Sequence, residues 1–499
     1  MTLPGSLTEE RSYVTVRASD VPLLAHVHTF DSPASVTTVL AVVSPLASPR
    51  AVAKDIAAMV ATGRRVVVVD HPGTGGSDPW AGSQHEWVDL VGGAVDATEL
   101  VALGPVAGSS PELALLADRL IPRRDGAHLA AAIDAVRAAW VFAPWHERTA
   151  AARRQATVPG AAALHDGALR LLESPSTLAA RGAWFDALGA HRFAPTRAAQ
   201  SVDPPRSYAN TRFGQIHVCT YGPRTQQPSV LALHPSPGSA RPYAHVAHQL
   251  SGTRRVIAPD MLGNGASDAA VMHHALVDAL SPEFGDQCGT SRTLADYADE
   301  AVAVLDALGE GLPVDIWGNH TGALIGMELA IRYPRRVRRL VMDGITMFDA
   351  AETADILARY LPPFELDEYG SHLFRAWGMR HDMSLFWPWY RTNADGFRAT
   401  GAVPTDVAHA NTMELLRSGP SFRVAYDAAF RYPTARRLPL VTVPTLLTVI
   451  AVDPLAGAAD EVARLLPTLQ RAGIGGYGPD HLNASVAVIT DFLDAAVFQ

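Results

Sequence analysis

The sequence predicts an α/β protein with a doubly wound, mostly parallel sheet and a helical cap, preceded by a truncated second copy of the same fold. Short apolar runs alternate with helical patterns, which is typical of βαβ units. The alternation is interrupted by a helical, aromatic stretch between about 347 and 439. In addition, the same order of apolar runs and turns occurs in two parts of the chain. With 499 residues, 48% of them hydrophobic, the chain is long enough for two domains with separate cores.

The shared pattern consists of an apolar run, a helical stretch, a second apolar run and a Gly-rich turn. Ser44 and Asp70 end these runs in the first copy, and His234 and Asp260 hold the corresponding places in the second. The separation is 26 positions in both cases. This agreement predicts a duplication. We interpret His234 as a structural loop residue, because a serine replaces it in the first copy.

A later pair of motifs, GAHL at 126–129 and GSHL at 370–373, extends the duplication with a larger offset. The offset between the copies is 190 residues at Asp70 and 244 residues at GAHL, so the first copy lacks 54 residues. The missing part includes the counterpart of 317–323. At most, VDLVGG at 88–93 survives as a remnant of the preceding strand.

These offsets predict a truncated domain over 1–195 and a complete domain over 206–499 with its cap at about 347–439. The polar, Pro-containing segment 196–205 is expected to be a linker. We expect the first copy to have a structural role. Its cap-like part should pack on the cap of the second copy in an intramolecular pseudo-dimer, and a homo-oligomer remains an alternative.

In the complete copy, each predicted strand is a short apolar run. One predicted helix, which precedes the strand at 314–317, has apolar residues at helical spacing. The strands are expected at 230–233, 256–258, 314–317, 339–342 and 445–450, and that helix at 294–308. The cap is expected over the carboxyl edge of the sheet, where ligands bind in such folds.

The stretch WGNHTGA at 317–323 lies between a predicted strand and a helical pattern. A sharp strand-to-helix turn has no room for large neighbours and holds its central residue in a strained conformation. Gly318 and Gly322 meet the first demand, and His320 is the central residue.

With HPSPG at 234–238 and DMLGNGASD at 260–268, this turn resembles the α/β-hydrolase superfamily. It is similar to a subgroup that has Gly-x-His-Thr-Gly in place of a serine nucleophile and a PWY-type cap motif, here at 388–390. The resemblance covers 206–499 and, in truncated form, 9–195. It implies an oxyanion hole made by the backbone N–H groups of Thr321 and Ser236, since the prolines flanking Ser236 have none.

A histidine at this turn allows three roles. His320 could act as a general base, as a nucleophile that forms an acyl-imidazole, or as a residue that only fills the pocket. The N-terminus of the following helix is expected to lower the pKa of His320 and keep it neutral at pH 7.

The resemblance also implies an acid and a second histidine. Asp453, after the penultimate strand, has the expected place of the acid, although a loop aspartate can instead cap a helix. Asp343, after strand six, is the alternative acid. His481 is either a shifted catalytic histidine or a surface residue.

The cap motif FWPWY at 386–390 supplies candidates for substrate binding. Trp387, Trp389 and Tyr390, with His381 and Arg391, could line a pocket for a small apolar or aromatic molecule. The alternative is that these aromatic side chains hold the cap to its own core.

Other function classes are disfavoured. The net charge is −9 and the basic residues are scattered, so neither nucleic acid nor a membrane surface is an expected partner. The sequence lacks the Lys of a P-loop, a dinucleotide fingerprint and HExxH spacing, so we expect neither a cofactor nor a metal. Two distant cysteines and the absence of a leader pattern predict a cytoplasmic protein.

The leading hypothesis is an enzyme that hydrolyses an ester, lactone or thioester with His320 in place of the usual serine. The alternatives are a lyase or isomerase that uses the same histidine, and a catalytically silent binding or scaffold protein. Fold alone does not decide among them.

Overall fold

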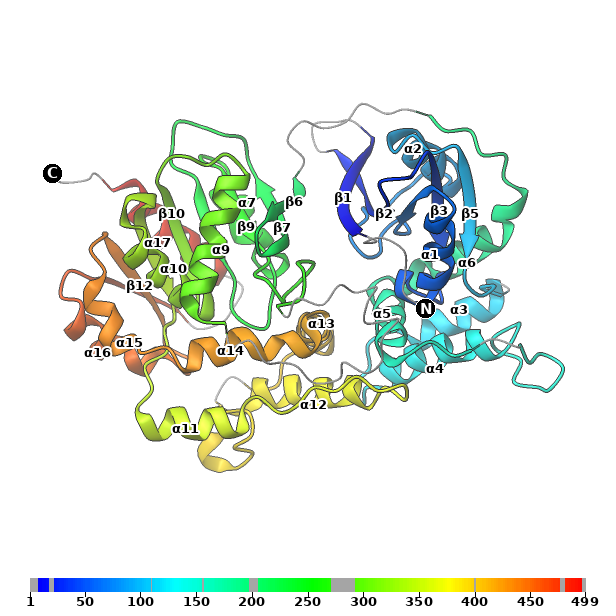
Figure 1. The fold of residues 1–499 in the computed structure, drawn as a ribbon. Helices are drawn as coiled ribbons and strands as arrows, with labels where there is room; N and C mark the ends of the chain where they lie inside the picture. The colour runs from blue at the N-terminus through cyan, green and yellow to red at the C-terminus, as the bar shows by residue number, and fades with distance from the viewer. Residues whose placement is uncertain are drawn as a thin grey trace. The chain divides into compact units, whose positions relative to one another are not determined.

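Figure 1 shows the fold in a computed structural model, which describes residues 8–17, 22–108, 110–154, 157–196, 205–270, 292–398, 401–475 and 481–495. The described residues form two compact units. The N-terminal unit contains those before 205 together with 365–377. The C-terminal unit contains 205–270, 292–364 and those from 378 onward.

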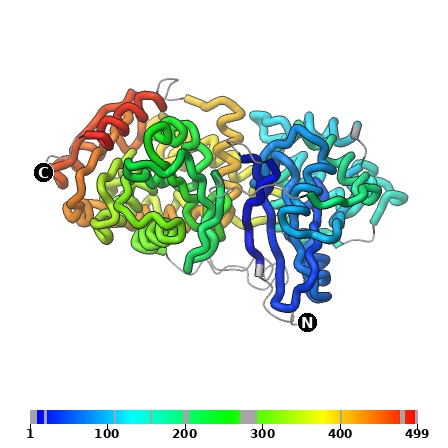
Figure 2. Tube along the Cα trace, turned by 90° about the horizontal axis from the view of Figure 1, so that it is seen from above, coloured from blue at the N-terminus to red at the C-terminus, as the bar shows by residue number. Residues whose placement is uncertain are grey.

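The N-terminal unit is built on a five-stranded sheet of order β1-β2-β4-β3-β5. Its strands are β1 Thr8–Arg17, β2 Leu23–Asp31, β3 Thr37–Val43, β4 Arg64–Val69 and β5 Glu99–Leu103. Strand β3 is parallel to β4 and β5, whereas β2 is antiparallel to β1 and β4. Figure 2 shows β1 and β2 side by side in dark blue. Because the valines of β4 are buried on both faces, the strand is a continuous apolar run.

In the described part of the chain, the helices that accompany this sheet are α1 Ala53–Ala61, α2 Gln84–Ala94, α3 Ser110–Arg119, α4 Ala127–Val141, α5 Ala161–Glu173 and α6 Leu178–Ala187. The prediction of a strand remnant at 88–93 is wrong, because these residues belong to α2. Their apolar spacing is helical: Trp87, Val88 and Val91 are buried on one face. The side chain of Ser83 accepts a hydrogen bond from Glu86 N and caps the helix.

The segment 365–377 packs within the N-terminal unit, although the sequence assigns it to the cap of the second copy. Trp377 Nε1 donates a hydrogen bond to Arg124 O (3.2 Å). The imidazole nitrogens His165 Nδ1 and His372 Nε2 are 3.0 Å apart, and both side chains are buried. The wider pseudo-dimer of the two caps stays a prediction.

The C-terminal unit has an eight-stranded sheet of order β13-β12-β11-β10-β8-β9-β7-β6. Its strands are β6 Arg206–Thr211, β7 Gly214–Tyr221, β8 Val230–Leu233, β9 Val256–Pro259, β10 Val314–Asn319, β11 Val337–Asp343, β12 Thr445–Ile450 and β13 Gln470–Ile474. The run from β13 to β9 is parallel, and β7 and β6 are antiparallel additions. The predicted mostly parallel, doubly wound sheet is confirmed.

Helices cover both faces of this sheet: α7 Ala244–Leu250 and α17 His481–Asp494 on one, α9 Leu294–Ala307 and α10 Thr321–Arg332 on the other, with α16 Ala459–Leu465 beyond β12. Successive side chains of a strand point to opposite faces. Accordingly, Val230 and Ala232 pack with α7 and α17, while Leu231 and Leu233 pack with α9 and α10. Burial on both sides therefore explains the unbroken apolar runs.

The predicted cap is helical. It contains α11 Ala350–Arg359, α12 Ser371–Leu385, α13 Thr405–Ser418, α14 Phe422–Phe430 and α15 Thr434–Arg437. Helix α11 begins at a capping box formed by Asp349 and Glu352. Among the described helices, none is both long enough and apolar enough to cross a membrane.

Candidate active site

His320 occupies the turn between β10 and α10 in a strained backbone conformation, with φ 47° and ψ −109°. A positive φ at a residue with a side chain costs on the order of 1–3 kcal/mol. The neighbouring glycines make the turn possible. A Cβ on Gly318 would lie 2.3 Å from Gly322 O, and one on Gly322 would lie 2.1 Å from Leu233 O.

The imidazole of His320 is paired with Asp453. His320 Nε2 lies 2.9 Å from Asp453 Oδ2, and Leu455 N donates to the other carboxylate oxygen at 2.7 Å. The side chain of Asp453 is 5% exposed and that of His320 is 35% exposed. Since a carboxylate accepts the Nε2 proton, the neutral ring keeps its lone pair on Nδ1. The turn therefore presents an oriented base.

The pKa of His320 is raised from its ordinary value of 6.5. Burial lowers this pKa, but the hydrogen bond to Asp453 and the charges of Asp453 and Asp343 raise it more. The sequence-based expectation of a lowered pKa is therefore wrong, because the two nearby carboxylates raise the pKa of His320 more than burial lowers it. His320 is a stronger base than an isolated imidazole, and it is protonated to a higher pH.

Asp343, the alternative acid, has other partners. Its carboxylate accepts hydrogen bonds from Thr448 Oγ1 (2.8 Å) and Asn319 Nδ2 (2.9 Å), and its backbone oxygen accepts one from His320 N (3.0 Å). Burial raises the pKa of Asp343. Of the two predicted acids, Asp453 contacts the imidazole, whereas Asp343 supports the turn from behind.

The ring of His320 has room because residue 344 is a glycine. A Cβ on Gly344 would lie 2.5 Å from His320 Cδ2, and Gly344 has φ 73°. We expect Gly344→Ala to displace the imidazole from Asp453 and to destabilise the C-terminal unit by roughly 1–3 kcal/mol. Urea unfolding, together with the chemical shifts of the His320 ring, measures both effects.

Gly457→Ala is the matched control, since nothing lies within 4 Å of a Cβ built there. It should leave both readouts unchanged. Equal behaviour of the two variants would contradict the steric role of Gly344.

The predicted oxyanion donors lie on two segments that meet. A Cβ on Gly322 would also approach His234 O, so the loop after β8 lies against the start of α10. Thr321 and Ser236 are buried, and neither backbone N–H donates a hydrogen bond within the described part of the chain. Both N–H groups are therefore available as donors, and an oxyanion hole formed by them stays a prediction.

His234 has the structural role that the sequence indicates. Its Nδ1 donates to Pro235 O (2.7 Å), and its Nε2 accepts from Met261 N (2.8 Å). Burial lowers the pKa of His234, so the ring is neutral, as these two bonds require.

The cap aromatics contact one another. Trp389 Nε1 donates to Tyr360 O (3.2 Å), and the rings of Trp387, Trp389 and Tyr390 meet the Tyr360 ring edge-to-face at 5.8, 6.2 and 6.2 Å. Tyr390 also donates its hydroxyl to Asp355 Oδ2 (2.8 Å). These contacts fasten the end of α11 to the segment after α12, and substrate contact stays a prediction.

The remaining predicted residues are placed as follows. Arg391 is exposed, with Nη2 3.9 Å from Asp355 Oδ2. His381 is partly buried on α12. His481 is the first residue of α17, and both its side chain and the loop 476–480 lie outside the described residues. Substrate binding by Arg391 and His381 and a catalytic role for His481 stay predictions.

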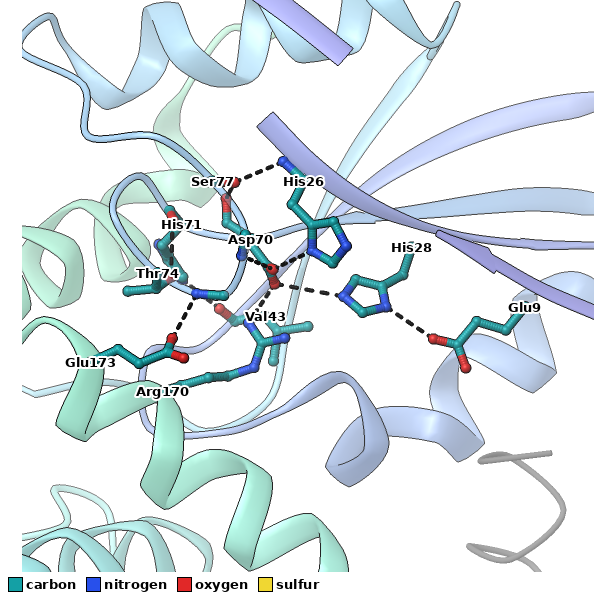
Figure 3. A network of polar contacts seen from close by, with 12 residues as sticks. Glu9, His26, His28, Val43, Asp70, His71, Thr74, Ser77, Arg170 and Glu173 are labelled. Atoms are coloured by element: carbon teal, nitrogen blue, oxygen red, sulfur yellow. Dashed lines mark hydrogen bonds and ion pairs between the residues drawn. The ribbon is translucent and has the colours of Figure 1, made fainter. Parts of the chain in front are cut away.

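A polar network in the N-terminal unit was missed by the sequence reasoning (Figure 3). Asp70 Oδ2 lies 2.7 Å from His26 Nδ1 and accepts a bond from Gly76 N, while Oδ1 pairs with Arg170. His28 Nδ1 lies 2.9 Å from Glu9 Oε1. The spacing His-x-His, which puts both rings on one face of a strand, is the signal that could have revealed it.

His26, His28 and Asp70 offer potential metal-ligand atoms within 4.8 Å of one another. Both oxygens of Asp70 are already engaged, one by the guanidinium of Arg170, which a cation would have to displace. The pair of His217 Nδ1 with Asp260 Oδ2 (2.9 Å) repeats the His26–Asp70 pair in the C-terminal unit. We therefore assign the pair to folding, since it ties a Gly-rich loop to the neighbouring strand.

Arg170 is expected to stabilise the N-terminal unit through Asp70, whose side chain is 1% exposed. Arg170→Met leaves this charge uncompensated and should cost roughly 3 kcal/mol. Burial raises the pKa of Asp70, but Arg170 and His26 hold it well below 3.8. The stabilisation is therefore complete above pH 3.8 and is lost as the pH falls below it. Hydrogen exchange of peptides from β2 and β4 measures the loss.

Arg50→Met is the control, because its pair with Asp166 is partly exposed (27% and 36%) and should contribute at most about 1 kcal/mol. Equal losses of stability in Arg170→Met and Arg50→Met would contradict a larger contribution from the buried Arg170–Asp70 pair.

Comparisons with known proteins agree with this geometry. A family model described as the alpha/beta hydrolase fold matches residues 228–478, just over half of the chain. A 2-hydroxymuconate semialdehyde hydrolase of Pseudomonas sp. (strain CF600) is 39% identical over 121 residues, 24% of this chain and 36% of that protein. A cis-3-alkyl-4-alkyloxetan-2-one decarboxylase of Shewanella oneidensis is 27% identical over 148 residues, 30% of this chain and 41% of that protein.

The chain thus spans less than half the length of these curated relatives. Among solved structures, the enol-lactonase from Burkholderia xenovorans LB400 is similar, with a TM-score of 0.42 and 14% identity, over 58% of this chain and all of that one (100%). By the match of the family model, the chain belongs to the α/β-hydrolase fold family.

Proposed function

We propose that the C-terminal unit hydrolyses a small carbonyl compound, an ester, lactone or thioester, with His320 as general base. The hydrogen bond between His320 Nε2 and Asp453 Oδ2 carries this proposal. It joins a partly exposed imidazole to a buried carboxylate, and it does so at a strained turn. A strained backbone conformation persists only where the surrounding structure holds it, and such conformations are common at active sites.

The chemistry follows from the two ring nitrogens. His320 Nδ1 removes a proton from a water molecule while the water oxygen attacks the carbonyl carbon. The carbonyl oxygen becomes an oxyanion, which the N–H groups of Thr321 and Ser236 stabilise. The imidazolium then returns the proton to the leaving group as the tetrahedral intermediate collapses, and Asp453 stabilises its charge throughout.

The substrate class draws support from the relatives. Two of them are named as hydrolases of 2-hydroxymuconate semialdehyde and of 2-hydroxy-6-oxo-2,4-heptadienoate, which are small carbonyl compounds. We extend this class to the present chain, with Trp387, Trp389 and Tyr390 as candidate lining for an apolar part of the substrate.

We also infer that the N-terminal unit is a truncated second copy with a mainly structural role. Corresponding His–Asp pairs support this. Two isolated β-bridges also support it, because Phe142 with Arg153 and Phe386 with Phe397 are related by the 244-residue offset.

Turnover of a panel of activated esters, lactones and thioesters, with mass spectrometry of acid-quenched enzyme, tests the hydrolase proposal. A general base predicts steady turnover without an acyl adduct on the protein. An adduct on His320 would make it a nucleophile instead. If the panel is inert while deuterium enters the substrate beside its carbonyl, the lyase or isomerase alternative replaces hydrolysis.

A further inference from the structure

The N-terminal unit has a cavity at the carboxyl ends of β3 and β4, where open α/β sheets bind ligands. Its empty space, counted together with the adjoining open solvent, is about 280 Å³. Its polar lining includes Ser44, Asp70, His71, Arg170 and Arg181. Figure 3 shows His71, Asp70 and Arg170 in this region.

Arg181 is buried in this lining, and the charge of Glu173 only partly offsets the effect of burial. The side chain of Arg181 is among the largest fully buried ones, with 1% of the residue exposed. Nη2 donates to Ser174 O (2.8 Å), but Nε has no hydrogen-bond partner within the described residues, and no ion pair of Arg181 occurs there. Burial lowers the pKa of Arg181 to about 10, so it remains charged at neutral pH. A buried guanidinium with an unused N–H group is stabilised when an anion accepts a hydrogen bond from it.

His71 adds an unused acceptor to the same lining. Its Nε2 donates to Val43 O (2.7 Å), and its buried Nδ1 has no partner within the described residues. Burial and the charge of Arg181 lower the pKa of His71 to about 3, so the ring is neutral and Nδ1 carries a lone pair. The lining thus offers a cation for an oxyanion and an acceptor for a hydroxyl.

In the C-terminal unit, different residues occupy the positions that the predicted duplication aligns with the lining of this cavity. Ser44 corresponds to His234, whose buried imidazole fills its site. With the 244-residue offset, Arg170 corresponds to Glu414, and Arg181 corresponds to an alanine. The N-terminal unit therefore combines a smaller residue at Ser44 with an added cation, Arg181, while the charge of Arg170 is paired with Asp70.

We propose that this cavity binds a small oxyanion that also carries a hydroxyl group, such as a hydroxycarboxylate or hydrogen phosphate. Arg181 Nε donates to the oxyanion, and His71 Nδ1 accepts from the hydroxyl. This site lies wholly within the N-terminal unit and does not depend on the reaction proposed for His320.

Titration calorimetry of the full chain with sodium glycolate, sodium phosphate, sodium acetate and sodium chloride, at matched ionic strength, tests the proposal. Glycolate or phosphate should bind, and the tighter of the two identifies the source of the oxyanion. Acetate lacks the hydroxyl and should bind more weakly, and chloride should give no saturable heat. Absence of binding by both glycolate and phosphate would overturn the proposal, and equal binding of acetate would overturn the role of His71.

Two variants locate the site. Arg181→Met removes the charge at similar size and should weaken binding roughly 10- to 100-fold, the value of a charge-assisted hydrogen bond. Ser44→His introduces the residue that the C-terminal unit holds at the aligned position, and it should abolish binding by filling the cavity. If Arg181→Met does not fold, Ser44→His remains a sufficient test. His320→Ala should bind as the wild type does, and a loss of binding there, with Ser44→His unaffected, would place the anion in the C-terminal unit and refute the proposal.

Discussion

Replacement of His320 by alanine is expected to lower kcat/KM for the best substrate of the panel by roughly 100- to 10,000-fold, the usual contribution of a positioned general base. The oxyanion donors and the substrate pocket remain, so a residual rate above the uncatalysed reaction should persist. In the wild type, kcat/KM should rise with pH through a value above 6.5, because the pKa of His320 is raised and only the neutral ring accepts a proton. Steady-state kinetics across pH measures both effects.

His245→Ala is the matched control, since this exposed histidine of α7 contacts Gln249 and should leave the rate unchanged. His320→Ser asks a separate question. If the wild type is inert and His320→Ser gains esterase activity, the fold has kept its oxyanion hole while the natural protein performs other chemistry or none. That outcome would refute hydrolysis by His320.

Asp453→Asn is expected to lower kcat/KM by a similar factor, roughly 100- to 10,000-fold, because the amide no longer fixes the proton on Nε2 or stabilises the imidazolium. Its effect on the pH profile is more specific. The hydrogen bond and charge of Asp453 raise the pKa of His320 against burial, so their loss should move the acidic limb to lower pH. A purely structural role for Asp453 would lower the rate without moving the limb.

Asp343→Asn discriminates between the two acids. The side chain of Asp343 bonds to Thr448 and Asn319 and acts on the His320 ring only through its charge, so Asp343→Asn should shift the limb less than Asp453→Asn does. A larger shift in Asp343→Asn would reverse the assignment of the acid.

The fold was predictable because its signals are local. Apolar runs, turn glycines and helical spacing are patterns within a few residues, and strands that are buried on both faces have nearly continuous apolar sequences. The error at 88–93 has the same origin. The apolar residues of a short run are compatible with either a strand or a helix. Here the segment forms a helix, which Ser83 caps and which buries Trp87.

The candidate site was predictable only in part. His320 followed from the glycines around it, but the direction of its pKa did not, because two carboxylates from distant strands determine it. The sequence allowed two interpretations of the cap aromatics; their contacts with Tyr360 and Asp355 hold segments of the cap together, and substrate contact stays a prediction. The network around Asp70 joins β2, β4 and α5, which no local pattern connects.

The sequence by itself determined the class of sheet, the repeated pattern, and a histidine at a turn that only glycines could flank. These properties depend on side-chain size and spacing along the chain. Only the tertiary structure decided that Asp453 rather than Asp343 contacts the imidazole, and that the buried Arg181 has an Nε without a hydrogen-bond partner among the described residues. Both outcomes depend on contacts between segments far apart in the chain. Burial and charge determine the free energy of such contacts, and local conformational preference does not.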